Sequence, residues 1–116
     1  MIELTIKTYL SQRLAEAGIE VGLELPPGKD PAKYVVIEKT GSSKTNRLPN
    51  ATLAIQSYGP SLYEAALLNE SVKSIMEDAA LLDDISKVSL NSDYNFSDPD
   101  TKRYRYQAIF QIWYYE

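Results

Sequence analysis

The sequence predicts an α+β fold of order α-β-β-β-α-β-β, in which two helices pack on one face of a mostly antiparallel sheet. Apolar residues recur at helical spacing in two separate segments of the chain. Five other segments show the two-residue alternation or the β-branched composition of strands. The 116 residues contain no internal repeat and no low-complexity linker, which indicates a single domain over residues 1–116.

The first helix is predicted at the start of the chain, where apolar residues recur every three or four positions. Gly18 fits the C′ position at which a helix ends, and Ile19 is placed to fold back onto Leu14 in a Schellman-type cap. Tyr9 lies beside the apolar stripe. The stripe itself consists of Ile2, Ile6, Leu10, Leu14 and Ala17.

Three strands are predicted next, in segments with alternating or β-branched residues. The loop "PPGKDPAK" between the first two carries prolines that prevent regular pairing. The segment "TGSSKTNRLPN" is predicted as a polar loop, and we expect its part from Gly41 to Asn50 to be mobile in a free subunit and ordered on assembly. The strands are IEVGLEL (Ile19–Leu25), YVVIEK (Tyr34–Lys39) and ATLAIQSYG (Ala51–Gly59).

A second helix is predicted to begin with "SLYE", which matches a capping box. The Ser61 hydroxyl would accept the Glu64 backbone N–H, and the Glu64 carboxylate would reach back to Ser61. A fourth strand, "ISKVSLNS", and a turn at "SDPD" lead into a long last strand that returns beside the fourth as a hairpin. The apolar stripe of the helix is Leu62, Ala65, Leu68, Val72, Ile75, Met76 and Ala79.

The last strand, in "KRYRYQAIFQIWYY", has two unlike faces. One row, from Tyr104 through Tyr106, Ala108, Phe110 and Ile112 to Tyr114, is apolar and is expected to pack against the helices. The opposite row is neither dry nor purely polar. Because protein interfaces are enriched in Arg, Trp and Tyr, we predict that this row contacts another protein, with a solvated sheet face and a nucleic-acid platform as alternatives. The predicted interface residues are Arg47 from the polar loop and Arg103, Arg105, Gln107, Gln111 and Trp113.

Composition excludes several classes of function. The chain has no cysteine and no histidine, so disulfides, thiolate metal sites, histidine ligands and the usual serine and cysteine nucleophile systems are absent. The net charge of −4 argues against a whole-domain nucleic-acid binder. No apolar run is long enough to span a membrane, and the start of the chain lacks the features of a signal peptide. We expect a soluble protein made in a cytoplasm, with no enzymatic activity, no cofactor and no bound metal.

Three short motifs resemble known sites but lack essential residues. "GSSKT" lacks the glycines of a phosphate-binding loop, because Ser43 and Glu38 stand at their positions. "DYNFSD" has calcium-loop spacing at its start, but Asp98 replaces the sixth-position glycine, and Asn95 and Asp98 are expected to hold a turn instead. Asp83 and Asp84 are adjacent, so they are expected to be solvated loop charges rather than an acid–base pair.

Two segments resemble tail terminator (tail completion, head–tail joining) proteins of long-tailed phages and prophages. In "NRLPNATLAIQSYGPSLYEAALL", as in that family, a loop arginine precedes a strand, a "YG-x-S" type turn and an alanine-rich helix. The segment "YNFSDPDTKRYRYQAIFQIWYY" resembles the family's late hairpin, in which an N-F-x-D-P turn leads into a strand with "RYQA". Together the segments cover 45 of the 116 residues.

The resemblance implies a virion structural protein of the tail–neck region, made in the cytoplasm of a bacterial host. Such a protein would form a ring, expected to be a hexamer, on the last ring of the tail tube. It would stop tube polymerisation and present a surface to the head connector. Its implied partners are further copies of itself, the tail tube protein and the connector or stopper protein, with DNA only passing through the ring and no membrane. A head-completion or minor capsid protein, or an accessory domain that binds nucleic acid or a small ligand, remains an alternative.

Overall fold

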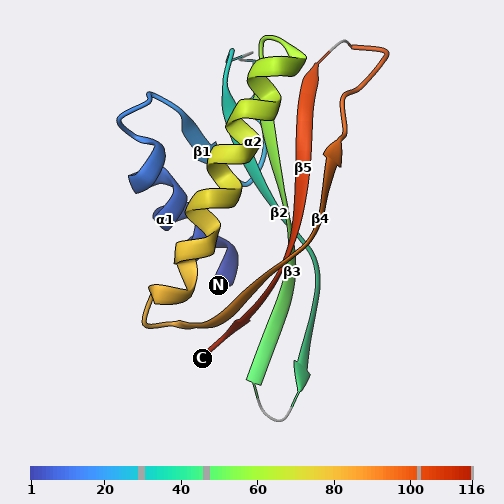
Figure 1. The fold of residues 1–116 in the computed structure, drawn as a ribbon. Helices are drawn as coiled ribbons and strands as arrows, with labels where there is room; N and C mark the ends of the chain where they lie inside the picture. The colour runs from blue at the N-terminus through green and yellow to red at the C-terminus, as the bar shows by residue number, and fades with distance from the viewer. Residues whose placement is uncertain (29–30, 46–47, 102, 116) are drawn as a thin grey trace.

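The computed structural model describes residues 1–28, 31–45, 48–101 and 103–115, and it confirms the α+β class and the predicted order of elements. The five strands form one sheet in the order β1-β2-β3-β5-β4, in which β1 runs parallel to β2 and all other neighbours are antiparallel. Both helices lie on the same face of this strongly twisted sheet (Figure 1). The elements are α1 (Ile2–Leu14), β1 (Glu20–Gly22), β2 (Tyr34–Thr45), β3 (Leu48–Gly59), α2 (Leu62–Glu77), the 3-10 helix η1 (Asp78–Leu81), β4 (Ile85–Asn95) and β5 (Tyr104–Tyr114).

Helix α1 ends in the predicted Schellman cap. Gly18 adopts a φ of 71°, a left-handed conformation that glycine tolerates best. The backbone N–H of Ile19 donates to the carbonyl of Leu14 at 3.3 Å, and that of Gly18 donates to Ala15 at 3.0 Å. The Tyr9 hydroxyl donates to the carbonyl of Ile75 at 2.7 Å, which joins α1 to α2.

Helix α2 begins with the two contacts predicted between Ser61 and Glu64. The Ser61 hydroxyl accepts the Glu64 backbone N–H at 3.1 Å, and the Glu64 carboxylate reaches back to Ser61, whose hydroxyl donates to it at 3.3 Å. Gly59 sets how closely the helix approaches β3. A Cβ at this position would lie 2.6 Å from the backbone nitrogen of Ala65, so a larger residue would displace the start of α2.

The core lies between the helices and the sheet. Val72 and Met76 of α2 pack with Ala108, Phe110 and Ile112 of β5, which confirms the predicted packing of these two elements. The helix stripe was predicted incorrectly at one end, because Leu62 is 40% exposed. Buried Asn69, which hydrophobic periodicity did not identify, donates to the Asp93 carboxylate at 2.9 Å.

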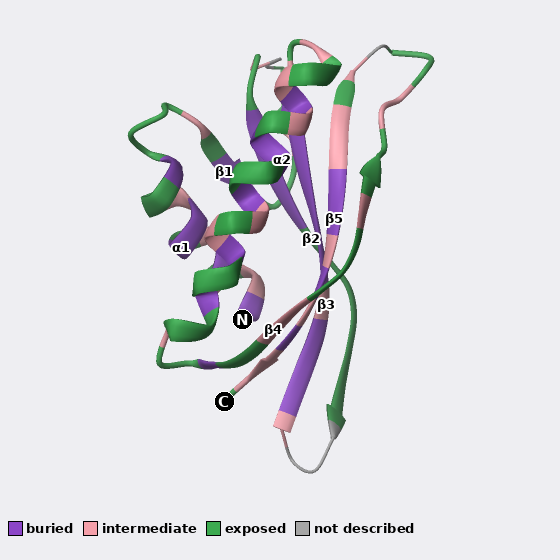
Figure 2. Cartoon of the chain, in the orientation of Figure 1, coloured by how far each residue is buried: buried purple, intermediate pink, exposed green. Residues whose placement is uncertain are grey.

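The predicted polar loop from Gly41 to Asn50 is wrong as a loop. Strand β2 continues to Thr45 and β3 begins at Leu48, so both arms pair almost to the tip of a long β2–β3 hairpin. The end of this hairpin projects beyond the helix-covered part of the molecule (Figure 1). Pro49 is tolerated in β3 because β5 begins to pair with β3 only at Asn50. Figure 2 shows the β3 arm largely buried and the β2 arm exposed near the tip.

Strand β1 is much shorter than predicted. Only Glu20–Gly22 pair, with Tyr34, Val35 and Val36 of β2, although the alternation continues to Leu25.

The turn before β5 is formed as predicted by hydrogen bonds from side chains to the backbone. The Asn95 carboxamide accepts the N–H of Ser97 at 3.0 Å, and the Asp98 carboxylate accepts that of Asp100 at 2.9 Å.

Candidate interaction surface

The candidate interaction surface is the face of the sheet opposite the helices, here called the outer face. Side chains alternate along each strand, so the residues between the core positions point to this face. The strand registers place them in rows that cross the sheet. Tyr94, Gln107 and Gln56 form one row, and Trp113 pairs with Asn50 in another. Residues distant in the sequence therefore meet on the outer face.

The row of Gln56, Gln107 and Tyr94 is joined by hydrogen bonds. The Gln56 side-chain amide donates to the carbonyl oxygen of Gln107 at 2.9 Å, and the Gln107 amide donates to the Tyr94 hydroxyl at 2.6 Å. Gln56 and Gln107 are each only 7% exposed. Gln107 therefore lies on the predicted face, but its side chain is buried and bonded within its own chain.

A second group of hydrogen bonds surrounds Gln111. The Thr52 hydroxyl donates to the Gln111 side-chain oxygen at 2.8 Å, and the Gln111 amide donates to the side-chain oxygen of Asn50. Ser43 of β2 donates to the same Asn50 oxygen at 3.0 Å. Gln111 thus helps to hold β2, β3 and β5 together near the turn end of the β2–β3 hairpin. Its side chain is half-buried, so part of it remains accessible.

Arg105 fastens the β4–β5 turn to the sheet. Its Nε donates to the carbonyl of Phe96 at 2.7 Å, and its Nη1 donates to the Tyr58 hydroxyl at 2.7 Å. The guanidinium carbon also lies 4.5 Å from the centre of the Phe96 ring and 5.6 Å from that of Tyr58, within the range of cation–π attraction. The Arg105 side chain, on β5, therefore contacts both the β4–β5 turn and strand β3.

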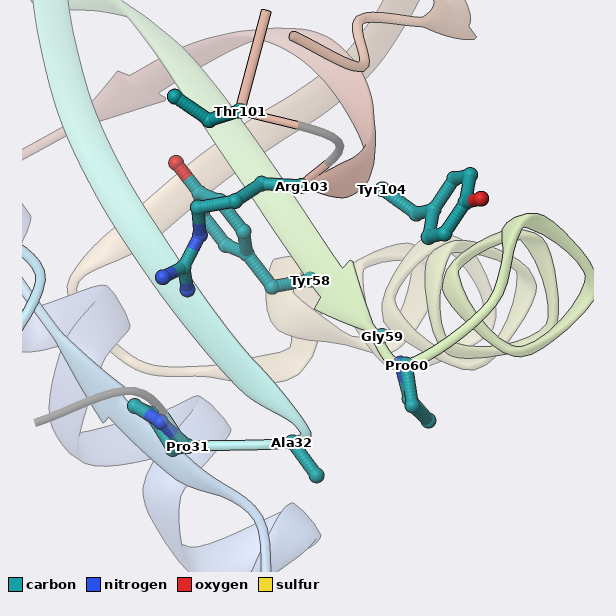
Figure 3. Close-up of a pocket in the computed structure, with 8 residues that line it drawn as sticks. All are labelled: Pro31, Ala32, Tyr58, Gly59, Pro60, Thr101, Arg103 and Tyr104. Atoms are coloured by element: carbon teal, nitrogen blue, oxygen red, sulfur yellow. The ribbon is translucent and has the colours of Figure 1, made fainter. Parts of the chain in front are cut away.

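Arg103 lines a pocket of about 270 Å³ at the end of the sheet near the start of α2. Figure 3 shows its side chain lying along the Tyr58 ring, whereas Tyr104 points away toward α2. The guanidinium carbon of Arg103 is 5.1 Å from the centre of that ring. Both Arg103 and Arg105 therefore lie within cation–π range of the Tyr58 ring.

Trp113 and Ile109 are the half-buried apolar residues that β5 contributes to the outer face. The Lys87 ammonium of β4 lies 5.0 Å from the centre of the Trp113 ring. Whether Trp113 contacts another protein stays a prediction. Arg47, the remaining predicted interface residue, lies outside the described residues.

The prediction from β5 omitted the contributions of the neighbouring strands. Asn50, Gln56 and Tyr58 of β3 are all buried on the outer face, and Tyr94 of β4 closes one row. The alternation in "NATLAIQSY" could have identified the β3 residues, because Asn50, Thr52, Gln56 and Tyr58 occupy every second position apart from Ala54. The sequence of one strand could not show that the side-chain amides of Gln56 and Asn50 form hydrogen bonds with Gln107 and Gln111.

Charged groups on the helix side form a small network of their own. Lys73 of α2 lies 2.9 Å from the Glu70 carboxylate and 3.0 Å from that of Asp93. Hydrogen bonds to Glu70 and then Asp93 raise the pKa of Lys73 above its usual value.

The described residues contain no group of three or more Asp, Glu, His or Cys side chains able to hold a metal ion. None of the described helices is long and apolar enough to cross a membrane.

The sheet has two open edges. Strand β1 pairs only with Tyr34–Val36, so no described strand pairs with the outer edge of β2 from Ile37 to Thr45. The outer edge of β4 is also without a partner strand in the described chain. Because each neighbour from β2 to β4 is antiparallel, β2 and β4 run in opposite directions. Unpaired N–H and C=O groups at such edges are a template for pairing with another chain.

No family model and no curated protein matches this sequence. The fold, however, is similar to that of a chain in a solved structure described as the virion of a native gene transfer agent particle. The two chains superimpose with a TM-score of 0.72 over 97% of this chain and 94% of the other, at 15% sequence identity. The likeness therefore extends over nearly the whole of both chains, and at this identity it shows a common fold.

Proposed function

We propose that this protein is a virion structural protein that forms a ring at the head-proximal end of a phage or prophage tail tube. The ring stops polymerisation of the tube and joins the tail to the head. The observation that carries the proposal is the likeness to a virion chain over nearly the full length of both chains. The sequence resemblance to tail terminators supports it independently, because it rests on residue motifs rather than on the fold.

The sheet edges support assembly into a ring. A ring needs a head-to-tail interface in which one surface of a subunit meets a different surface of the next. Strand β4 on one side of the subunit and the open part of β2 on the other are two such surfaces. Since the two strands run in opposite directions, β2 of one copy could extend the sheet of the next as an antiparallel neighbour of β4.

The outer face supports a second contact, with the tail tube or the head connector. Its buried amides hold the sheet, and its half-buried residues remain accessible to a partner. We assign that contact to Trp113 with the accessible parts of Arg103, Arg105 and Gln111. Arginine and tryptophan are the side chains that most often anchor a protein interface.

The proposal is tested by deleting the gene from the element that encodes it and measuring tail lengths by electron microscopy. We expect tails of uncontrolled length that are not joined to heads, and we expect the wild-type gene to restore both properties. Tails of normal length beside heads that lose DNA would indicate a head-completion protein and contradict the proposal. Normal particles would indicate a dispensable accessory protein. Complementation with Trp113→Ala tests the outer-face contact, and full rescue would exclude that residue from it.

A further inference from the structure

A groove between α2 and β4 forms a second candidate site on the helix side of the sheet. Its volume is about 280 Å³, and Glu70, Ser74 and Glu77 of α2 form its rim. Val88, Leu90 and Phe110 form an apolar floor, in which Leu90 is 43% exposed. Such a groove suits a side chain that combines an aliphatic stem with a positive end.

The charge of this groove is negative. Lys73 lies on the rim, but it is already shared between Glu70 and Asp93. The exposed Glu77 forms no ion pair with any of the described residues. The 21 residues from Glu64 to Asp84 contain six acidic residues (Glu64, Glu70, Glu77, Asp78, Asp83 and Asp84) and a single basic residue, Lys73.

The β2–β3 hairpin has the opposite charge. Between Lys39 and Tyr63 the sequence contains Lys39, Lys44 and Arg47 and no acidic residue, in a chain whose net charge is −4. Lys44 is exposed and pairs with Pro49. Because Pro49 alternates in phase with the core residues Ala51 and Leu53, Lys44 lies on the helix side of the sheet. The hairpin therefore presents positive charge and an aliphatic stem on the side where the groove lies.

The hairpin does not serve the groove of its own chain. The paired ends of its arms, up to Thr45 and from Leu48, project away from the helix layer, whereas α2 and β4 meet over the body of the molecule (Figure 1). The complementary charges can be joined only between two copies. If the open edge of β2 runs along β4 of the next copy, Lys44 lies on the helix side of β4, which is the side that carries the groove.

We infer that the groove between α2 and β4 binds the β2–β3 hairpin of a second copy of this chain, with Lys44 beside Glu77. The inference rests on the proposed ring and names the contact that closes it. It is a head-to-tail contact, in which every copy gives one hairpin and receives another. Its ionic component is exposed enough to weaken as salt concentration rises.

Paired cysteines test the contact directly, because the natural chain contains none. Ser42→Cys in the hairpin and Ser74→Cys in the groove replace exposed residues with side chains of similar size. In assembled particles, a short bis-maleimide should give a ladder of cross-linked oligomers on a denaturing gel. The control pair Ser42→Cys with Gln12→Cys, on the exposed side of α1, should give no ladder. Intact particles without a ladder from the first pair would overturn the inference.

Charge reversal provides a second test on the same particles. Glu77→Lys should lower the incorporation of the protein into particles at least about tenfold, because it places like charges together. Adding Lys44→Glu in the same chain should restore incorporation. Glu16→Lys makes the same change in net charge at an exposed position outside the groove and should have no effect. A cross-linked ladder from the cysteine pair would support this contact. If the deletion strain nevertheless made tails of normal length, that result would contradict the terminator role.

Discussion

The two faces of the central sheet are held by different forces. On the helix side, Leu53, Ile55 and Phe110 are at most 2% exposed and gain their stability from burial of apolar surface. On the outer face, Gln56 and Gln107 are nearly as well buried but are held by hydrogen bonds. Low exposure on the outer face therefore reflects side chains that form hydrogen bonds with one another. A partner can therefore use only the remaining accessible part of this face.

The largest effect is expected on the helix side. Phe110→Asp would place an unpaired charge in the core, and we expect the domain to lose its folded structure. Circular dichroism and thermal melting provide the measurement. Tyr63→Asp is the matched control, since Tyr63 is 72% exposed and its loss should change stability by less than ~0.5 kcal/mol. A Phe110→Asp variant that melts like the parent would show that the β5 faces are assigned the wrong way round.

Arg105→Ala should have the largest effect among the outer-face arginines. The change removes two hydrogen bonds and the ring contacts with Phe96 and Tyr58, and we expect a loss of about 2 kcal/mol in the free energy of unfolding. Arg105→Lys should not restore it, because lysine lacks the planar fork that bonds both partners. Denaturant titration of the two variants gives the measurement. Parental stability in Arg105→Ala would mean that the side chain is free to act as an interface anchor alone.

The amide pair on the outer face should show strong coupling. Gln107→Ala leaves the Gln56 amide buried without its acceptor and should cost about 1–2 kcal/mol in the free energy of unfolding. Replacing both glutamines with leucine should cost less than the sum of the two single leucine changes, because neither amide of the pair then remains buried without the other. A double-mutant cycle by denaturant titration measures this coupling. Simple additivity would show that the outer face is not held by its hydrogen bonds.

The smallest effect is expected from pH. Because the pKa of Lys73 is raised in the folded state, the contribution of Lys73 to stability is fully present below its usual value of 10.5 and is lost as pH rises through the folded pKa. Burial also raises the pKa of Tyr9, which acts in the same direction. We therefore expect Lys73→Met to be less sensitive than the parent to pH between about 10 and 11. If the stability of both proteins fell equally over this pH range, the loss of stability at alkaline pH would be assigned to the tyrosines.

Much of the fold could be predicted because the signals are local. The cap at Gly18, the Ser61–Glu64 cap and the turn at Asp98 each depend on residues only a few positions apart. The hairpin was missed because its polar residues lack the apolar alternation that identifies a half-buried strand. Pairing with β3 holds Ser42, Ser43 and Lys44 extended, and no local propensity encodes that pairing.

The candidate surface was predicted only in part for a similar reason. Alternation along β5 correctly placed Arg105, Gln107 and Gln111 on one face. It could not show that Gln107 is bonded to Gln56, because that partner is 51 residues away in the sequence. Arg105 was predicted to contact another protein. Its hydrogen bonds to Phe96 and Tyr58 could not be predicted, because they depend on how the folded turn and β3 lie beside β5.

The location of the protein in a particle tests the central claim most directly. Purified particles of the encoding element, labelled with an antibody to this chain and colloidal gold, should carry gold only at the junction between head and tail. Isolated tails should carry it at one end. The deletion strain provides the control for antibody specificity. Gold distributed along the tail or over the head shell, or particles without label, would contradict a ring that terminates the tail and joins it to the head.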